Sequence, residues 1–377
     1  MAGGDLALAL SGGGARGAYQ AGVIRRLSQR FPDLRFTIIT GVSAGAINAS
    51  FIATHPGPLA EAMDELCGIW SCLQVEDIFR VDTPSLARHF TRWATRLASG
   101  GSPVAPAVRG LVDSAPLHGT IERSSSTVDG ELIGIERNLE RKRLKALALT
   151  ALNYSTGQTV TWVQGRGFQP WYQPRHRSFP ARIAVEHVMA SAALPLFFPA
   201  VRLGDDWYGD GGVRLSTPLV PALRLGATRI LAISPHHEPS FEEADRLKST
   251  GYPPPAQILG HLMDSIFLDI LDEDVRRLKS INELLAKLPP EERGGLRHVA
   301  IRVLRPSRDL GELAASFEPR LPSGFRYLVR SLGTRDTQTS DFLSMLMFQP
   351  DYLQRLIELG EEDAEARLEK VRELVEG

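Results

Sequence analysis

The sequence predicts an α/β protein with a mainly parallel sheet and helices packed on its faces. The apolar segment 6–10 leads into a glycine-rich loop and then into a helical pattern over about 18–30. The same order follows directly, because the apolar strand 35–40 runs into GVSAGAINASFIA at residues 41–53. Two successive β–loop–α units are typical of a parallel sheet, in which helices connect neighbouring strands.

Four further segments are predicted strands, at residues 144–153, 159–163, 228–234 and 297–304. The first, third and fourth are nearly continuous apolar runs, as expected of parallel strands that are buried on both faces. The last 27 residues, from Asp351, carry alternating charges at helical spacing, which predicts a solvated helix. The Pro/Gly-rich stretch 98–110 and the polar loop 235–256 are predicted insertions or linkers.

Composition narrows the function classes. The chain of 377 residues is 43% hydrophobic and 23% charged, as in ordinary globular proteins, and its net charge of −1 argues against a general nucleic-acid binder. The first residues lack the pattern of a signal peptide and no stretch is apolar enough to span a membrane, so we expect a cytoplasmic protein. The spacing of Cys67 and Cys72 fits neither a zinc pair nor a redox motif, and we expect reduced thiols, no metal and no cofactor.

The glycine loop alone allows several interpretations. Gly12-x-Gly14-x-x-Gly17 between a strand and a helix is nominally a dinucleotide fingerprint. That interpretation also requires an acid at the end of the second strand, but this strand ends in Thr40, and Asp33 precedes it. No G-K-[ST] closes the loop, which argues against a nucleoside triphosphate. A tight turn without a ligand remains the structural alternative.

The segment GVSAG at residues 41–45 matches G-x-S-x-G, with Ser43 at a strand-to-helix corner. Such a corner exposes the serine oxygen, and the helix that begins there directs backbone N–H groups toward a developing negative charge. A serine in an ordinary turn is the alternative. Because the glycine loop would follow the neighbouring strand, we expect it to supply the donors for a transient oxyanion.

A serine nucleophile needs a base. His236 and His237 follow a predicted strand and have the position expected of an α/β-hydrolase histidine. Asp210 in WYGDGGV is the other candidate, since Gly211 and Gly212 allow close approach of the backbone to another loop. Apolar surroundings would raise the pKa of Asp210 and so make it a better base. Taken alone, it could equally be a plain turn aspartate.

Together these motifs resemble the patatin-like phospholipase family. SGGGARGAYQAG resembles its glycine-rich block, GVSAG its nucleophile elbow and DGG its aspartate motif, and residues 190–212 resemble the approach to that aspartate. The resemblance covers about residues 5–235. It implies a three-layer α/β/α fold and a serine–aspartate dyad that hydrolyses acyl esters of membrane lipids, without a cofactor or metal.

Carried over by position, the resemblance makes Ser43 the nucleophile and Asp210 the base. It assigns the oxyanion loop to Gly12, Gly13, Gly14, Ala15, Arg16 and Gly17, the elbow to Gly41, Val42, Ala44 and Gly45, and the aspartate motif to Gly211 and Gly212. We expect a catalytic domain over 1–235, and over 236–377 a helical C-terminal extension that continues the α/β domain and ends in a charged helix. A structural role for the Arg16 side chain is favoured over contact with a lipid phosphate.

Two alternatives stay open: an esterase or thioesterase with His236 or His237 as base, and a non-catalytic nucleotide-binding protein. A membrane phospholipid or another acyl-ester lipid is the expected partner.

Residues 84–112 contain several basic residues and no acidic residue, with apolar residues between the basic ones. This pattern predicts a lid or membrane-docking helix within an insertion at 84–115. An ordinary amphipathic helix packed on the core is the alternative. The residues concerned are Arg88, Arg92, Arg96 and Arg109, with Phe90, Trp93 and Leu97 between them.

Overall fold

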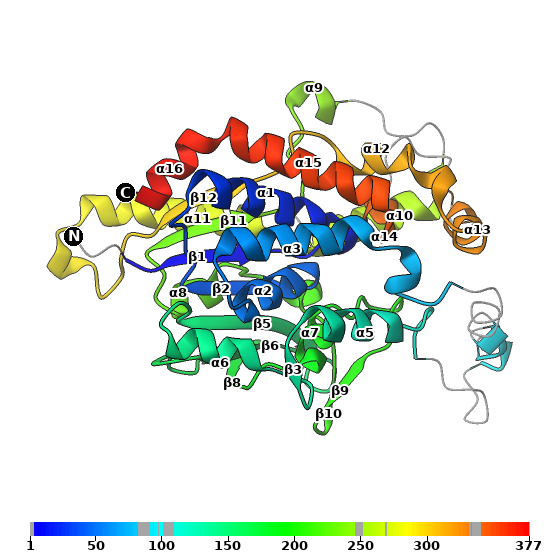
Figure 1. Cartoon of the computed structure of the whole chain (residues 1–377), viewed down its shortest axis with the longest axis horizontal. Helices are drawn as coiled ribbons and strands as arrows, with labels where there is room; N and C mark the ends of the chain where they lie inside the picture. The colour runs from blue at the N-terminus through cyan, green and yellow to red at the C-terminus, as the bar shows by residue number, and fades with distance from the viewer. Residues whose placement is uncertain are drawn as a thin grey trace.

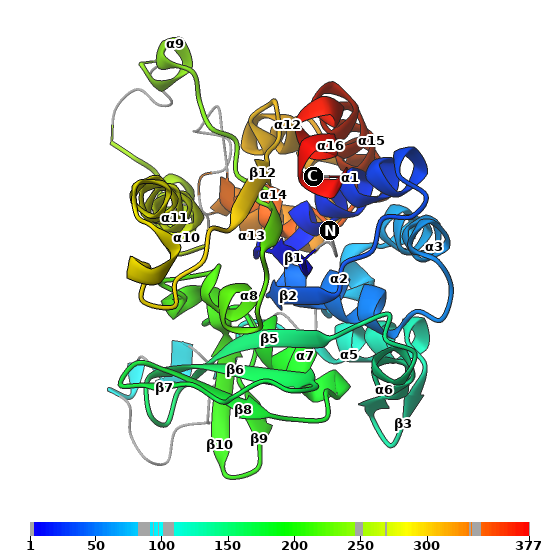
Figure 2. The ribbon, with the colours of Figure 1, turned by 90° about the vertical axis from the view of Figure 1, so that its left-hand side faces the viewer.

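The fold is organised around a ten-stranded sheet that crosses the centre of Figure 2. The computed structural model describes residues 4–81, 91–92, 94–96, 98–100, 109–245, 252–267, 270–331, 333 and 341–376. Five neighbouring strands run parallel, in the order β12 (Ala300–Leu304), β11 (Arg229–Ile233), β1 (Leu6–Leu10), β2 (Ile38–Val42) and β5 (Ala146–Asn153). Beyond β5 the sheet continues with β6 (Gln158–Gly165), β8 (His176–Pro180) and β7 (Tyr172–Gln173).

Strand β5 has two partners on one of its edges. Strand β2 pairs with it in parallel up to Val42, which lies opposite Thr150. Strand β10 (Asp206–Asp210) pairs with the following residues in the antiparallel sense, so that Asp210 lies opposite Ala151. The last residues of β2 and β10 therefore meet end to end beside β5. Strand β9 (Val201–Leu203) completes a hairpin with β10.

Helices cover both faces of the sheet, which confirms the predicted three-layer α/β/α class (Figure 2). Because side chains alternate along a strand, Leu8 and Leu10 face one layer and Ala7 and Ala9 the other. The first layer contains α1 (Gly17–Arg30), α2 (Ala44–Thr54), α3 (Leu59–Cys72), α6 (Ile133–Glu140) and α7 (Val185–Ser191). The second contains α8 (Val220–Arg224) and α11 (Ile270–Lys287).

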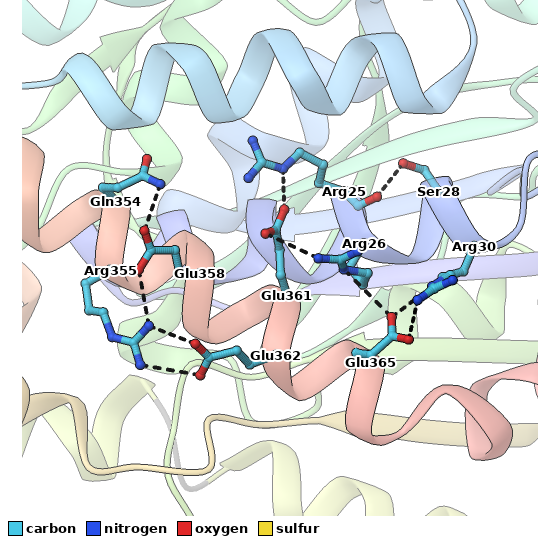
Figure 3. A network of polar contacts seen from close by, with 10 residues as sticks. All are labelled: Arg25, Arg26, Ser28, Arg30, Gln354, Arg355, Glu358, Glu361, Glu362 and Glu365. Carbon is cyan, nitrogen blue, oxygen red and sulfur yellow. Dashed lines mark hydrogen bonds and ion pairs between the residues drawn. The ribbon is translucent and has the colours of Figure 1, made fainter.

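Small residues and ion pairs join α1 to α15 (Pro350–Ala366), which lies beside it in Figure 1. A side chain at Gly22 would lie 2.1 Å from the carbonyl oxygen of Ile357, so the helices touch through their backbones. At the edge of the contact, Arg25 bonds Glu361 at 2.5 Å (Figure 3). Further pairs in this network join Arg26 to Glu361 and Glu365, and Arg30 to Glu365.

This packing corrects the solvated helix expected from residue 351 onward. The segment forms two helices, α15 and α16 (Leu368–Glu376), and each has a buried face. Leu353, Leu356 and Ile357 are fully buried, while the charged residues occupy the opposite side or pair with α1. The charge density concealed a stripe of apolar residues at helical spacing.

Further helices of eight or more residues lie toward the right-hand end of Figure 1, where the carboxyl ends of the parallel strands are found. They are α5 (Ala115–Ser124), α10 (Pro255–Phe267) and α13 (Ser323–Ser331). Short helices include α9 (Phe241–Ala244), α12 (Leu310–Ala315) and α14 (Asp341–Leu346), and β3 (Thr127–Val128) pairs with β4 (Glu131–Leu132). Single-turn 3₁₀ segments occupy Gly14–Arg16, Val75–Asp77, Gly211–Arg214, Pro290–Glu292 and Glu318–Arg320.

The basic segment predicted at 84–112 is described only in part. Arg88, Phe90, Trp93 and Leu97 lie outside the described residues. Arg92 and Arg109 are exposed, and Arg96 is half-buried. Within the described part of the chain, no helix combines the length and apolar character needed to cross a bilayer.

Candidate active site

Ser43 occupies the corner between β2 and α2 and has a backbone conformation that is rare for a residue with a side chain (φ 57°, ψ −130°). Its glycine neighbours make the corner possible. A Cβ atom at Gly41 would lie 2.4 Å from the carbonyl oxygen of Gly45, and one at Gly45 would lie 2.4 Å from that of Leu10. The segment 41–45 thus has the strained strand-to-helix geometry of a nucleophile elbow.

A second serine supports this corner. The backbone N–H of Ser43 donates to Oγ of Ser191 at 3.0 Å, and that hydroxyl donates to the carbonyl oxygen of Thr150 at 2.6 Å. Ser191 is the last residue of α7 and is fully buried. The bridge therefore fixes the elbow to β5 at the position where β2 ends and β10 begins. No motif in the sequence marked Ser191 for this role.

Asp210 reaches the elbow through the pairing of β10 with β5. A Cβ atom at Gly211 would lie 2.2 Å from the carbonyl oxygen of Thr150, so only glycine lets the turn after Asp210 lie on β5. The backbone N–H of Gly212 donates to Oδ1 of Asp210 at 2.9 Å, and that of Asp210 donates to the carbonyl oxygen of Ala193 at 2.9 Å. Hydrogen bonds therefore hold both the side chain and the backbone of Asp210 in place.

The Asp210 carboxyl is fully buried, and burial raises its pKa from 3.8 to about 7, as expected of a carboxylate removed from water. The Ser43 hydroxyl and the Gly212 N–H act in the opposite direction because they favour the ionised form. Within the described residues, Oδ2 of Asp210 has no hydrogen-bond partner of good geometry. The Ser43 hydroxyl is nevertheless near enough to the carboxyl to lower the pKa of Asp210. Loose contacts of this kind are common in sites without substrate.

The glycine loop packs against the elbow. Gly13 and Gly14 have positive φ angles of 152° and 58°, and a Cβ atom at Gly14 would lie 2.2 Å from the carbonyl oxygen of Met345. The backbone N–H groups of Gly12 and Gly13 donate to no described residue. A Cβ atom at Gly17 would lie 3.2 Å from that of Ala44, which keeps the loop close to the start of α2.

The Arg16 side chain is buried in a polar cluster, as expected for a structural role. Its Nη2 lies 2.6 Å from Oδ1 of Asp341, and its Nε donates to Oγ of Ser344 at 2.7 Å. Nη1 lies 4.0 Å from Asp264, and the preceding Ala15 is fully buried. Asp264 on α10 and Asp341 and Ser344 on α14 thus hold the loop. Sequence reasoning did not identify these residues.

A buried hydrogen-bond network joins the glycine loop to the helix behind the elbow. Nδ2 of Asn48 donates to the carbonyl oxygen of Gly17 and to Oε1 of Gln20, both at 3.0 Å. Gln20 in turn donates to the carbonyl oxygen of Ser11 at 2.8 Å, and Trp70 donates to Oδ1 of Asn48 at 2.8 Å. Sequence reasoning missed this network, although a lone asparagine in an apolar helix was its available signal.

Ser43 and Gly14 line one apolar pocket, which holds about 760 Å³ of atom-free space including its open mouth. Side chains from α2, α3 and α5 form most of its wall, among them Ile47, Phe51, Leu66, Trp70 and Ile121, and Phe198 also contributes. Few polar groups face the pocket. Its chemistry suits a hydrocarbon chain whose reacting end lies at Ser43.

The histidine candidates do not join this site. His237 is near the carbonyl oxygen of Pro306 at 3.0 Å and near Glu243 at 3.3 Å. Neither His236 nor His237 is among the described residues that line the pocket at Ser43. As far as the chain is described, no three side chains of His, Cys, Asp or Glu are arranged to hold a metal ion.

The protein combines a three-layer α/β fold with a serine at a strand-to-helix corner and a buried carboxylate beside it. This combination is typical of one class of protein. Comparison with known families identifies which one, because residues 8–223 match the family described as Patatin-like phospholipase. The chain belongs to the patatin-like phospholipase family, which consists of lipid acyl hydrolases. No curated protein matched the chain.

The solved structures that match the chain share little sequence with it. VipD from Legionella pneumophila is 13% identical, with a TM-score of 0.42, and the match covers 97% of this chain and 67% of that one. Human GIVD cytosolic phospholipase A2 is 12% identical, with a TM-score of 0.47 and coverage of 99% and 60%. The type III effector protein ExoU is 14% identical, with a TM-score of 0.38 and coverage of 98% and 53%. The chain therefore spans only part of these proteins' length.

Proposed function

We propose that the protein hydrolyses acyl ester bonds of membrane phospholipids or lysophospholipids, with Ser43 as nucleophile and Asp210 as general base. The observation that carries the proposal is the end-to-end meeting of β2 and β10 along β5, which brings Ser43 and Asp210 together. Family membership supports the reaction class, and the apolar pocket supports a lipid substrate.

In the acylation step, Asp210 accepts the proton of the Ser43 hydroxyl while Oγ attacks the carbonyl carbon of the acyl ester. The negative charge that develops on the carbonyl oxygen would be stabilised by N–H groups of the glycine loop, where those of Gly12 and Gly13 are free of described partners. The tetrahedral intermediate collapses, the ester C–O bond breaks, and Asp210 returns the proton to the leaving alcohol. The acyl group remains on Ser43.

In the deacylation step, Asp210 takes a proton from water, and the resulting hydroxide attacks the acyl-Ser43 carbonyl. The second intermediate releases the fatty acid and restores the Ser43 hydroxyl with the proton from Asp210. One carboxyl group therefore serves as base and acid in turn. Its pKa of about 7 suits both tasks near neutral pH, whereas an exposed aspartate would be too weak a base.

The test is fatty-acid release from mixed phospholipid and lysophospholipid vesicles by wild type, Ser43→Ala and Asp210→Asn. Loss of either group should lower release by about 10⁴-fold or more. A fluorophosphonate probe should label wild type, and the label should be absent from Ser43→Ala. The products identify the preferred lipid and the ester position that is cleaved.

Histidine variants supply the control. His236→Gln and His237→Gln should retain fatty-acid release, because neither side chain lines the Ser43 pocket. Undiminished release by Asp210→Asn, together with loss in either histidine variant, would reject the dyad in favour of a histidine base. Labelling of Ser43→Ala as strong as that of wild type would reject Ser43 as the nucleophile.

A further inference from the structure

We propose that an apolar rim beside the Ser43 pocket docks the protein on the surface of an anionic phospholipid bilayer, with Leu196 as the side chain that enters the lipid. We define the docking rim as Leu194, Leu196, Ile258 and Leu262. The inference rests on the proposed function, because a lipid hydrolase must receive its substrate from a bilayer. It assigns a surface for that contact.

Leu196 is unusual in both conformation and exposure. Its φ angle is 65°, in the left-handed region that a leucine rarely adopts, and 72% of it is exposed. A single exposed leucine is ordinary on protein surfaces. A leucine that is exposed and also held in a strained conformation is unusual, because both the strain and the exposure oppose folding.

Several main-chain hydrogen bonds hold the turn that presents Leu196. The backbone N–H of Phe198 donates to the carbonyl oxygen of Leu194 at 2.8 Å and closes the turn. The N–H of Leu111 lies 3.0 Å from the carbonyl oxygen of Leu196, and that of Val112 donates to Phe197 at 3.1 Å. The buried Phe197 and the pocket residue Phe198 follow directly, so Leu196 is fixed beside the pocket.

Helix α10 reaches the same site through Met263 and carries two exposed apolar side chains. Leu194 and Met263 pack on Met345, whose carbonyl oxygen contacts Gly14 of the glycine loop. Next to Met263 on α10, Leu262 is 53% exposed, and Ile258 one turn earlier is 43% exposed. An i, i+4 pair lies on one face of a helix, so α10 adds an outward apolar stripe.

Charge next to the rim favours an anionic lipid surface over a neutral apolar partner. Arg109 is exposed and precedes Gly110 and Leu111, and Leu111 bonds the turn at Leu196. A Cβ atom at Gly110 would lie 2.8 Å from the backbone nitrogen of Pro199, so the two segments touch. An exposed apolar tip next to a segment that carries an exposed basic residue matches the hydrocarbon and anionic headgroups of a bilayer.

The test measures vesicle binding of the full chain carrying Ser43→Ala, so that the lipid is not consumed. Cosedimentation uses phosphatidylcholine vesicles with and without phosphatidylglycerol. Adding Leu196→Gln should weaken binding about tenfold, because a buried leucine side chain contributes roughly that factor. Adding Arg109→Gln should weaken binding about fivefold on the anionic vesicles alone.

Leu284→Gln is the matched control. Leu284 lies on α11, is 60% exposed and is outside the rim, so the same chemical change there should leave vesicle binding unaltered. Equal binding by the Leu196→Gln and Leu284→Gln variants would overturn the proposal. Equal effects of Arg109→Gln on both vesicle types would overturn its electrostatic part.

Two further measurements, made with Ser43 intact, separate docking from catalysis and from folding. Hydrolysis of a water-soluble short-chain ester reports the catalytic site alone. If Leu196→Gln lowers it as much as vesicle hydrolysis, Leu196 acts in the catalytic site and docking is rejected. If the parent protein hydrolyses no ester but binds vesicles through Leu196, the proposed function fails and docking stands. Leu196→Gly should raise the unfolding midpoint by removing strain and still weaken vesicle binding.

Discussion

The guanidinium of Arg16 donates to the carboxylate of Asp341 at 2.6 Å, across a separation of 325 residues. Arg16 belongs to the glycine loop, and Asp341 begins α14, beyond the residues 8–223 that match the family. The carbonyl oxygen of Met345, also on α14, occupies the space that a side chain at Gly14 would need. The C-terminal third of the chain thus forms one wall of the glycine loop.

Replacing Asp341 by Asn should destabilise the protein and lower turnover. The change removes the main counter-charge of the buried Arg16, and breaking a buried ion pair typically costs about 3–5 kcal/mol, less where an amide still accepts a hydrogen bond. Because the loop would supply oxyanion donors, kcat on a water-soluble ester should fall more than KM changes. Urea unfolding and steady-state kinetics measure the two effects.

Asp351→Asn is the matched control for Asp341→Asn. Asp351 pairs with Arg320 on the surface, where both side chains are more than half exposed, and such pairs contribute below about 1 kcal/mol. Asp351→Asn should therefore leave both unfolding and kcat close to wild type. Equal losses in the two variants would mean that the Arg16–Asp341 pair has no special role in the loop.

Activity should depend on pH through Asp210. A general base must be ionised, and burial raises the pKa of this carboxyl to about 7. We expect kcat/KM for a neutral water-soluble ester to rise with pH and to level off above about 7. A rise centred near pH 4 would show that the catalytic base is a carboxyl with an ordinary pKa.

Stability should depend on pH in the opposite direction. The pKa of Asp210 is higher in the folded state, about 7, than the ordinary 3.8, so the folded protein holds this proton more tightly. The resulting stability is complete below about pH 4 and is lost as the pH rises to 7. The slope of about 1.36 kcal/mol per pH unit ends near the folded-state pKa of about 7. Between pH 5 and 8, wild type should therefore lose about 3 kcal/mol relative to Asp210→Asn. Parallel pH profiles of unfolding free energy would contradict this.

The two cysteines should react differently with a thiol reagent. Cys72 is exposed, whereas Cys67 is buried on α3 and burial raises its pKa to about 12. Because the thiolate is the reactive form, the native protein should react quickly at Cys72 alone. Unfolding in urea should make both thiols reactive. Mass spectrometry of the labelled native protein checks this, and rapid labelling of Cys67 would show that α3 opens readily.

Local patterns predicted the elements on either side of the serine corner well. The strand 6–10 and the β–loop–α order are present in the structure, and the corner at Ser43 has the expected conformation. The apolar pattern predicts the second strand at 35–40, whereas the strand extends from Ile38 to Val42, directly to Ser43. Short-range signals sufficed here because glycines and continuous apolar runs determine the backbone locally.

Contacts between distant segments were not predictable in this way. The DGG motif identified Asp210 as a candidate, but only the pairing of β10 with β5 shows that it meets the end of β2. The buried Gln20–Asn48–Trp70 network likewise joins three helices. Such partners depend on the register of the sheet and on helix packing, and one sequence carries neither explicitly.

An added Cβ atom would affect two glycines, Gly14 and Gly68, in opposite ways. At Gly14, φ is 58° and an added Cβ would lie 2.2 Å from the carbonyl oxygen of Met345, which as backbone cannot move aside cheaply. Gly14→Ala should therefore distort the glycine loop, reduce kcat severely and destabilise the fold by more than about 1 kcal/mol.

Gly68 lies within α3, where an added Cβ would meet no atom within 4 Å. Gly68→Ala should stabilise the protein by about 0.5–1 kcal/mol, because alanine favours the helix, and should leave catalysis unchanged. Urea unfolding and ester hydrolysis of both variants decide the matter. If Gly14→Ala behaves like Gly68→Ala, then α14 does not press on the glycine loop in solution, and the C-terminal third of the chain has no part in shaping the site.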